Sequence, residues 1–347
     1  MPEAKAQTRS ALFELTRMRV LETLRDPGAL FWVFVAPVLL AVGLGLAFRN
    51  RAPEPIRVVV ADSPGLAAAL RVDPTLKVEE AGLEDARWKL RRAQADVLVQ
   101  DLGVEVLFRY DESRPEGRTA RLAVDRALAV AAGQRPAVPP RDEKVTEPGS
   151  RYIDFLLPGL LGMNLMGSSM WGLGYGLVDA RRRNLLKRLA ATPMRRRDYL
   201  LSVLLARLIF LVGETVALVT VGHFAFGVEV QGSLAAVGAL ALLGGFGFAG
   251  LALLVAARTA STEVATGLMN LVMMPMYLLS GVFFSASHFP DWLQPLIRAL
   301  PLTALNDALR AVINEALPLA SQWPQVAVLA AWGVLPFAVA LRLFRWQ

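Results

Sequence analysis

The sequence has 347 residues, of which 54% are hydrophobic and 19% are charged, and its formal net charge is +7. It contains no cysteine, which excludes disulfide, thiolate and iron–sulfur chemistry. The apolar residues gather in uncharged runs that are too long for the helices of a water-soluble core. About 20 apolar residues in a helix cross the ~30 Å hydrocarbon layer of a bilayer, so the sequence predicts an integral membrane protein.

Residues 1–27 precede the first apolar run and mix hydrophobic with basic side chains. This pattern predicts an amphipathic helix in the cytoplasmic membrane interface. Asp26 and Pro27 then begin the next helix, Asp26 as its N-cap and Pro27 as its first residue. The first span, residues 28–48, is longer than the apolar part of a signal peptide and lacks a cleavage pattern, so we expect a permanent transmembrane helix.

Residues 49–151 form a polar insert in which acidic and basic side chains are nearly balanced. Short apolar runs predict strands at 56–61, 76–80, 96–100 and 104–110. Helical spacing predicts helices at 63–71, 83–93 and 118–132. This alternation is typical of a small α/β domain, which we expect outside the membrane, with a proline-rich linker at 134–149 that leads to the second span.

Residues 152–347 are expected to form a five-helix transmembrane domain. Its predicted spans are 155–178, 199–226, 230–257, 264–287 and 323–341. Residues 288–318 are too polar to cross the membrane and too apolar for an ordinary loop, which predicts short re-entrant helices in the outer leaflet, anchored by Trp292 and Trp323. The expected fold is a polytopic α-helical membrane protein with six transmembrane helices and an inserted small α/β extracytoplasmic domain.

Lysine and arginine are unequally distributed over the short connections between these spans. Sixteen lie on the side of the N-terminus and two on the opposite side, and the side with the excess faces the cytoplasm. The sequence thus predicts a multi-pass protein of the cytoplasmic (inner) membrane with both termini in the cytoplasm. Eight of the sixteen belong to the loop 179–198, within the acid-free segment 181–197. Anionic membrane lipids account for this charge, so nucleic acid is not an expected partner.

Several motifs that would indicate chemistry are absent or lie in the wrong context. Gly245, Gly247 and Gly250 match the dinucleotide-binding fingerprint, but they lie inside an uncharged span without a preceding strand, which indicates close helix packing instead. No lysine precedes serine or threonine, so the chain has no phosphate-binding loop of its own. His223 and His288 are too isolated for a metal site. We expect no catalytic residue, no metal and no directly bound cofactor.

The predicted spans contain polar residues that must face protein or water. Arg207 and Glu214 share one helix face, but they are about 10.5 Å apart along the axis, so we do not expect a direct bond between them. Each either pairs with another helix or lies in a transport path. The same two alternatives, interhelical hydrogen bonding or a substrate path, apply to the uncharged polar residues Asn164, Ser168, Ser169 and Asn270.

Together these features resemble the permease subunits of type-2 ABC exporters, in particular a drug-exporter-like subgroup with a large external domain after the first span. The similarity rests on an interfacial helix that ends in Arg25-Asp26-Pro27, on the insert and the six spans, and on the segment 183–193. That segment is similar to the family's coupling segment, although Asn184-Leu185 stand where many members carry Gly-Thr or Gly. The residues that the resemblance assigns to ATPase coupling are Asn184, Leu185, Leu186, Arg188, Leu189, Thr192 and Pro193.

The resemblance implies a permease that pairs with a second permease, identical or related, and with cytoplasmic ATPase subunits that bind ATP and Mg. Leu185, Leu186 and Leu189 would then insert into a groove of the ATPase while the flanking arginines hold the helix at the membrane. The implied function is outward transport of hydrophobic or amphipathic substrates, such as drugs or lipids, without enzymatic activity in this chain. Two alternatives remain: a membrane-anchored ligand sensor or scaffold that acts through the external domain, and an ion-coupled secondary transporter.

Overall fold

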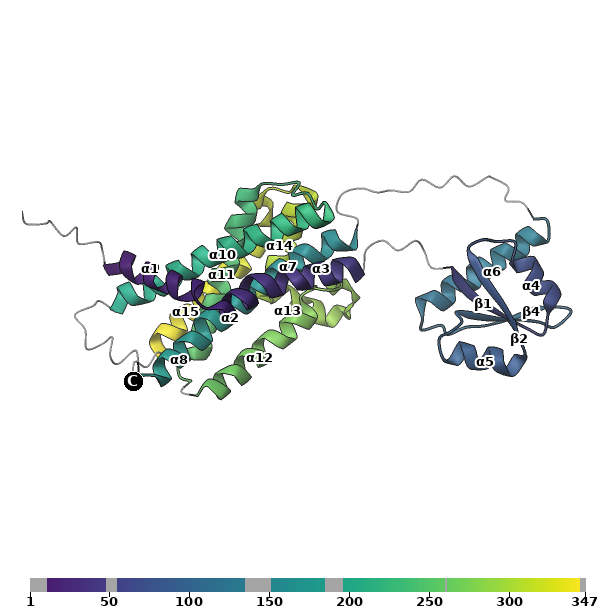
Figure 1. Cartoon of the computed structure of the whole chain (residues 1–347), viewed down its shortest axis with the longest axis horizontal. Coiled ribbons are helices and arrows are strands. Elements are labelled where there is room, and N and C mark those ends of the chain that lie inside the picture. Colours follow the sequence, from purple (N-terminus) through teal and green to yellow (C-terminus); the bar gives the residue numbers. More distant parts are fainter. Residues whose placement is uncertain (1–10, 48–54, 135–150, 185–195, 260, 344–347) are drawn as a thin grey trace, which may run out of the picture. The chain divides into compact units, whose positions relative to one another are not determined.

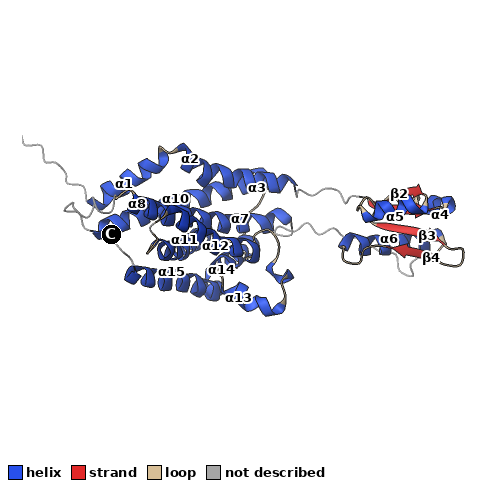
Figure 2. Ribbon diagram, turned by 90° about the horizontal axis from the view of Figure 1, so that it is seen from below, coloured by secondary structure: helices blue, strands red, loops and turns tan. Residues whose placement is uncertain are grey.

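The computed structural model describes residues 11–47, 55–134, 151–184, 196–259 and 261–343, with the backbone alone at Ala11 and residues 196–200. The chain divides into two compact units. One comprises Asn50–Val145, and the other comprises Met1–Arg49 together with Thr146–Gln347. The first unit contains strands and helices, whereas the described part of the second is helical (Figures 1 and 2).

The helical unit begins with α1 (Ala11–Leu24), which lies within the expected interfacial segment. Asp26 follows, and its Oδ1 accepts hydrogen bonds from the backbone N–H groups of Gly28 at 2.9 Å and Ala29 at 3.1 Å. Pro27 occupies the first position of α2, as predicted. The helix continues without a break; its parts are α2 (Pro27–Leu30), the π-helical η1 (Phe31–Val35) and α3 (Ala36–Ala47).

The remaining long helices form one bundle with α3 (Figure 1). Their bounds are α7 (Tyr152–Ser169), the π-helical η2 (Met170–Tyr175), α8 (Gly176–Arg182), α10 (Arg196–Phe226), α11 (Leu234–Ala256), α12 (Thr262–Leu279) and α15 (Trp323–Leu343). Four described helices are long and apolar enough to cross a membrane: Pro27–Ala47, Leu201–Phe226, Leu234–Ala256 and Leu319–Leu343. The expected span at 155–178 falls on the run α7–η2–α8. The expected span at 264–287 agrees only in part, because α12 ends at Leu279 and the chain turns after it. The chain is therefore a multi-pass membrane protein.

Between α12 and α15 the chain forms short helices and one longer one. The elements are η3 (Ala286–His288), η4 (Asp291–Leu293), α13 (Gln294–Ala299), α14 (Pro301–Glu315) and η5 (Leu319–Gln322). Eleven residues of α14 are buried, because the helix packs against α7, α11 and α15. Part of the predicted re-entrant segment is thus a central element of the core.

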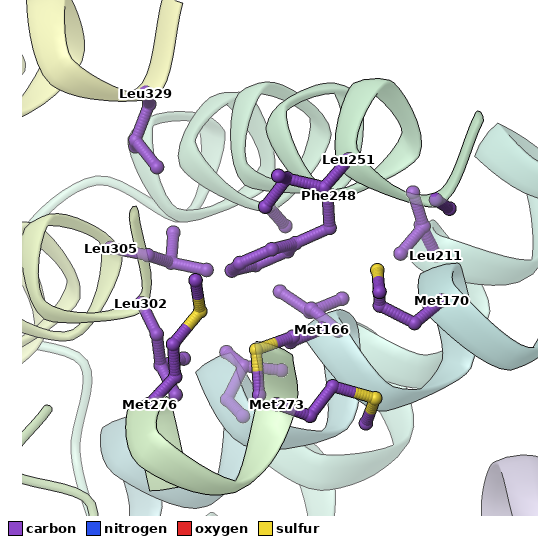
Figure 3. Close-up of a cluster of buried hydrophobic side chains, with 14 of the residues drawn as sticks. Met166, Met170, Leu211, Phe248, Leu251, Met273, Met276, Leu302, Leu305 and Leu329 are labelled. Atoms are coloured by element: carbon purple, nitrogen blue, oxygen red, sulfur yellow. The ribbon is translucent and has the colours of Figure 1, made fainter. Parts of the chain in front are cut away.

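The core of the bundle is rich in methionine. Figure 3 shows Phe248 of α11 among side chains from α7, α12 and α14. Its labelled neighbours there include Met166, Met273, Met276 and Leu305, which are all less than 5% exposed. Methionine has three rotatable bonds and fills irregular gaps, which suits a point where several helices meet at different angles.

The glycines of the fingerprint-like motif allow close helix contacts. A Cβ at Gly250 would lie 2.6 Å from the carbonyl oxygen of Gly333 on α15, and a Cβ at Gly247 would lie 3.3 Å from that of Leu329. Both distances are to backbone, which cannot move aside as a side chain can. The prediction that these glycines serve helix packing is confirmed.

The α/β unit contains a four-stranded sheet with the order β2-β1-β3-β4. The strands are β1 (Ile56–Ala61), β2 (Leu76–Ala81), β3 (Val97–Asp101) and β4 (Val106–Arg109), and only β4 is antiparallel to its neighbour. The helices are α4 (Pro64–Leu70), α5 (Leu83–Arg91) and α6 (Pro115–Ala131). All seven elements agree with the sequence prediction to within a few residues at their ends.

Alternation along the strands gives the sheet two buried faces. Val58 and Val60 of β1 face α4 and α6, whereas Val59 between them faces α5. The helices accordingly lie on opposite sides of the sheet (Figure 1). Asp96, which is 9% exposed, accepts two hydrogen bonds from the guanidinium of Arg57 and one from its backbone N–H. The unit therefore has its own core and an ion pair whose carboxylate is buried.

We expect residues 52–150, expressed alone, to be soluble and folded. The two hydrophobic clusters of the sheet lie entirely within this range, so no contact with the helical unit is needed to bury them. Far-ultraviolet circular dichroism should show mixed helix and strand, and thermal unfolding should be cooperative. A spectrum of disordered chain would contradict this prediction.

Gly250→Ala should destabilise the bundle by about 1–3 kcal/mol, because the new methyl group meets the backbone of α15. Gly238→Ala on the same helix is the matched control, since a Cβ there meets nothing within 4 Å and alanine favours the helix. Thermal unfolding of the purified full-length chain in detergent compares the two. Equal unfolding temperatures would show that the contact between α11 and α15 tolerates a side chain.

Candidate functional site

A group of polar side chains lies buried between α7 and α10, and we call Asn164, Ser168, Arg207 and Glu214 the polar cluster. Arg207 donates from Nη1 to Glu214 Oε1 at 2.9 Å and from Nη2 to Glu214 Oε2 at 3.3 Å. From α7, the Ser168 hydroxyl lies 2.7 Å from Glu214 Oε2 and also accepts a hydrogen bond from Arg207. Asn164 donates to the same carboxylate at 3.3 Å.

The expectation that Arg207 and Glu214 do not bond directly is wrong. Seven residues are nearly two helical turns, so the two Cα atoms lie on one face but about 10.5 Å apart along the axis. Arginine and glutamate both have long side chains, and these extend toward each other along the helix surface until the charged groups meet. Axial rise alone was a poor guide because it ignored the reach of the two side chains.

Burial makes this ion pair a strong constraint. The side chain of Arg207 is 9% exposed and that of Glu214 is not exposed. Two buried charges lose their hydration, and only a bidentate geometry with further hydrogen bonds compensates for that loss. Ser168 and Asn164 supply those bonds from α7. The polar cluster therefore connects α7 to α10 inside an otherwise apolar bundle.

The other polar residues predicted in the spans are not part of this cluster. Ser169 is fully buried, and its Oγ has no hydrogen-bond partner within the described residues. Asn270 lies on an exposed face of α12, among the exposed apolar side chains Leu268, Leu271 and Met274. The structure thus brings together four of the six residues and leaves Ser169 and Asn270 apart.

A second set of contacts lies at the end of α8, where the basic segment begins. Arg181 donates from Nη1 to the carbonyl oxygens of Ala256 and Thr259, both at 2.8 Å. Arg182 donates to Thr262 Oγ1 at 3.0 Å. The last carbonyl groups of a helix have no partner within the helix, so Arg181 satisfies the end of α11. These two arginines join the start of the basic segment to the connection between α11 and α12.

Asn184 follows α8 with a φ of 56°. Asparagine and glycine are the residues that most readily adopt this left-handed conformation after a helix. Asparagine can therefore occupy a position where many members of the resembled family carry glycine. The other residues assigned to coupling, Leu185, Leu186, Arg188, Leu189, Thr192 and Pro193, lie outside the described residues.

Sequence reasoning missed Arg310, which it counted only as a cation in an outer loop. Its side chain on α14 is 13% exposed and stacks over the ring of Phe155 at 3.8 Å. It also donates to the carbonyl oxygens of Phe155, at 3.2 Å, and Gly281. Near it, Asn306 donates to Ser280 O at 3.0 Å, which adds a second contact between α14 and the end of α12. No motif in the sequence marks a guanidinium that binds carbonyl groups far along the chain.

These polar contacts connect the helices of the bundle. The Ser168 hydroxyl of the polar cluster is held between Arg207 and Glu214, and no group of three or more His, Cys, Asp or Glu residues that could hold a metal occurs in the described part of the chain. The arrangement instead holds helices together at the middle of the bundle and at the end that carries Arg181.

A family model described as ABC-2 family transporter protein matches residues 27–342. The chain belongs to this family. The match covers most of the sequence, and it confirms the resemblance drawn from the segment 183–193 and from the order of the apolar runs. ABC-2 permeases are membrane transport subunits without an ATP site of their own.

Individual relatives agree with this membership. Over 103 residues the chain is 33% identical to Nodulation protein J of Rhizobium meliloti (strain 1021). The aligned region covers 30% of this chain and 39% of that protein. Over 199 residues it is 23% identical to the probable multidrug ABC transporter permease YbhR of Escherichia coli (strain K12). The aligned region covers 56% of this chain and 54% of that protein. Over 196 residues it is 23% identical to ABC transporter G family member 20 of Dictyostelium discoideum. The aligned region covers 56% of this chain and 27% of that protein. The chain therefore spans about half or less of the length of these relatives.

Glu214→Gln should lower the free energy of unfolding by about 3–5 kcal/mol, because it leaves the guanidinium of Arg207 buried without a counter-charge. Combining Arg207→Met with Glu214→Leu removes both charges and should recover most of this loss. Thermal unfolding of the full-length chain in detergent measures both variants. If the single and double variants are equally destabilised, the loss comes from packing and not from the unpaired charge.

Adjacent serines give a matched test of the contact from α7. Ser168→Ala removes a hydroxyl that lies between two charged groups and should cost about 1.5–3 kcal/mol. Ser169→Ala removes a buried hydroxyl without a partner in the described chain, so it should be neutral or stabilising. The same unfolding measurement applies. Equal losses at the two positions would contradict the special role of Ser168.

Proposed function

We propose that this chain is the permease subunit of an ATP-driven exporter that moves hydrophobic or amphipathic substrates outward across the cytoplasmic membrane. The observation that carries this proposal is the family match over residues 27–342. A relative named as a probable multidrug permease supports the substrate class, and long apolar helices suit cargo that dissolves in the bilayer. Family membership favours this proposal over a sensor or an ion-coupled transporter.

The proposed topology has six membrane spans and both termini in the cytoplasm. Four spans are the helices already found long and apolar enough to cross. The other two are the continuous helical run at 152–182 and α12. This topology places the α/β unit outside the membrane, and the unequal distribution of lysine and arginine supports it.

In this proposal the ATP and Mg²⁺ are bound by a separate cytoplasmic ATPase, which docks on the loop 179–198. The contacts of Arg181 and Arg182 support that location, because they connect the start of the loop to the end of α11 and to the start of α12. The polar cluster adds a second connection, since α7 leads into the loop and α10 leads out of it. A displacement of the loop would therefore reach four helices of the bundle, α7, α10, α11 and α12.

The proposed assembly includes a second permease. From Val264 to Leu278 the exposed side chains of α12 are apolar, apart from the side-chain amide of Asn270. An amide that faces hydrocarbon lacks hydrogen-bond partners, so this face is better suited to a second permease or to a substrate path than to lipid. Either role agrees with the assignment that Asn270 received from the sequence.

Leu186→Asp or Leu189→Asp should abolish transport and release the ATPase while the permease still inserts and folds. Both leucines lie outside the described residues, and the prediction rests on their helical spacing in the sequence. Truncating a buried anchor at an interface commonly costs about 2 kcal/mol or more, and a charge in its place costs more. Co-purification of the ATPase and substrate-stimulated ATP hydrolysis in membranes measure the effect.

Arg196→Ala is the control for this experiment. A surface ion pair contributes roughly 0–1 kcal/mol, and seven other cations remain in the segment 181–197. Coupling should therefore persist. Full coupling in both leucine variants together with its loss in Arg196→Ala would show that the ATPase is held by charge and not by the leucines.

A further inference from the structure

An apolar groove of about 300 Å³ opens between α11 and α15 on the outside of the helical unit. Its lining residues are Leu254, Ala331, Trp332, Leu335, Pro336 and Val339. The volume is at the lower end of the range of ~300–1,000 Å³ for ligand sites. Trp332 forms one wall, and its indole N–H donates to the carbonyl oxygen of Ala299 at 2.8 Å, which fixes the ring. The groove is thus a preformed feature of the surface.

The two helices run in the same direction, so their C-terminal ends lie together. Gly247 approaches Leu329 and, one turn later, Gly250 approaches Gly333. Arg258 lies eight residues beyond Gly250, and Arg342 lies nine beyond Gly333. A rise of 1.5 Å per residue places Arg342 about 14 Å past the close contact, and α11 ends at Ala256, about 9 Å past it and two residues before Arg258.

Helical spacing places Arg342 beside the groove, and Arg258 follows directly after the end of α11, the other helix of the groove. Arg342 continues the line of Trp332, Leu335 and Val339 at intervals of three and four residues. Arg258 lies in the turn that follows α11, four residues after Leu254. Both side chains are exposed, and neither guanidinium has a hydrogen bond or ion pair with any described residue. An apolar groove therefore ends at a pair of cations that have no counter-charge in the described chain.

We propose that this groove binds an anionic phospholipid of the cytoplasmic leaflet, with one acyl chain against Trp332 and the phosphate between Arg258 and Arg342. The inference rests on the membrane orientation proposed above and goes beyond the export function. An acyl chain matches a groove lined almost wholly by carbon, and a lipid phosphate at the membrane surface matches two exposed guanidinium groups at its end. An uncharged apolar ligand has no anionic group that the two guanidinium groups could bind.

The test uses the full-length permease in vesicles of phosphatidylethanolamine that contain a minor fraction of phosphatidylglycerol with brominated acyl chains. Bromine quenches tryptophan fluorescence on contact. We expect the brominated phosphatidylglycerol to quench the tryptophan fluorescence of the permease. Part of this quenching should be absent in Trp332→Phe. Brominated phosphatidylethanolamine at the same mole fraction should not produce that part, and equal quenching by both lipids would overturn the proposal.

Two pairs of variants separate the groove from the charges. Arg258→Gln and Arg342→Gln should each raise the phosphatidylglycerol fraction for half-maximal quenching about fivefold, and together about 30-fold. Arg298→Gln, an exposed cation on α13, should leave it unchanged. Ala331→Phe, which fills the groove, should remove the Trp332-dependent quenching, whereas Val334→Phe on another face of α15 should retain it.

Three further results would overturn the proposal. Quenching that persists in the double arginine variant would show that the headgroup does not select the lipid. Persistence in Ala331→Phe would place the lipid elsewhere. A change from dimer to monomer in Ala331→Phe, measured by native mass spectrometry, would show that a second copy of the chain covers the groove. None of these measurements requires an ATPase, so their failure is distinct from a failure of the proposed export function.

Discussion

The buried pair of Arg207 and Glu214 is the constraint on which the middle of the bundle depends. A charge in the centre of an apolar helix is tolerated only when its partner and its remaining hydrogen bonds are all in place. Both charges lie on α10, but two of the groups that complete their hydrogen bonding lie on α7. The depth and rotation of α7 relative to α10 are therefore set by polar geometry, whereas apolar contacts alone would permit sliding.

Arginines have a related function at the ends of the helices, where carbonyl groups lack partners. Arg181 binds carbonyls at the end of α11, and Arg310 binds Gly281 O just after α12. Arg151 donates to Phe226 O at 2.9 Å and to Gly227 O at 3.0 Å, where α10 ends, and it also pairs with Asp154. Each guanidinium has five N–H donors in one plane, so one side chain can satisfy several carbonyls at once. The helices are joined through their unsatisfied ends as well as through their apolar faces.

The sequence predicted features that depend on local pattern. The strands and helices of residues 50–145, the N-cap at Asp26 and the packing role of Gly250 all follow from spacing and from the immediate neighbours. Features that depend on the reach of a side chain or on distant partners did not follow. The bond between Arg207 and Glu214 needed the extended lengths of both side chains, and the burial of α14 needed the positions of three other helices. A single sequence contains no signal for either.

The same contacts indicate how the bundle can respond to movement of the basic segment. One end of α12 is held by Arg182 from α8, while Arg181 holds the connection that precedes it, and the other end is held by Arg310 and Asn306 from α14. These are mostly bonds from flexible side chains to carbonyl oxygens, which have two lone pairs and accept over a broad range of angles. The charged pair of the polar cluster, by contrast, is buried and bidentate, so a small displacement would break the pairing of both charges. We therefore expect α7 and α10 to move as one body while α12 tilts against it, with its two ends acting as the joints.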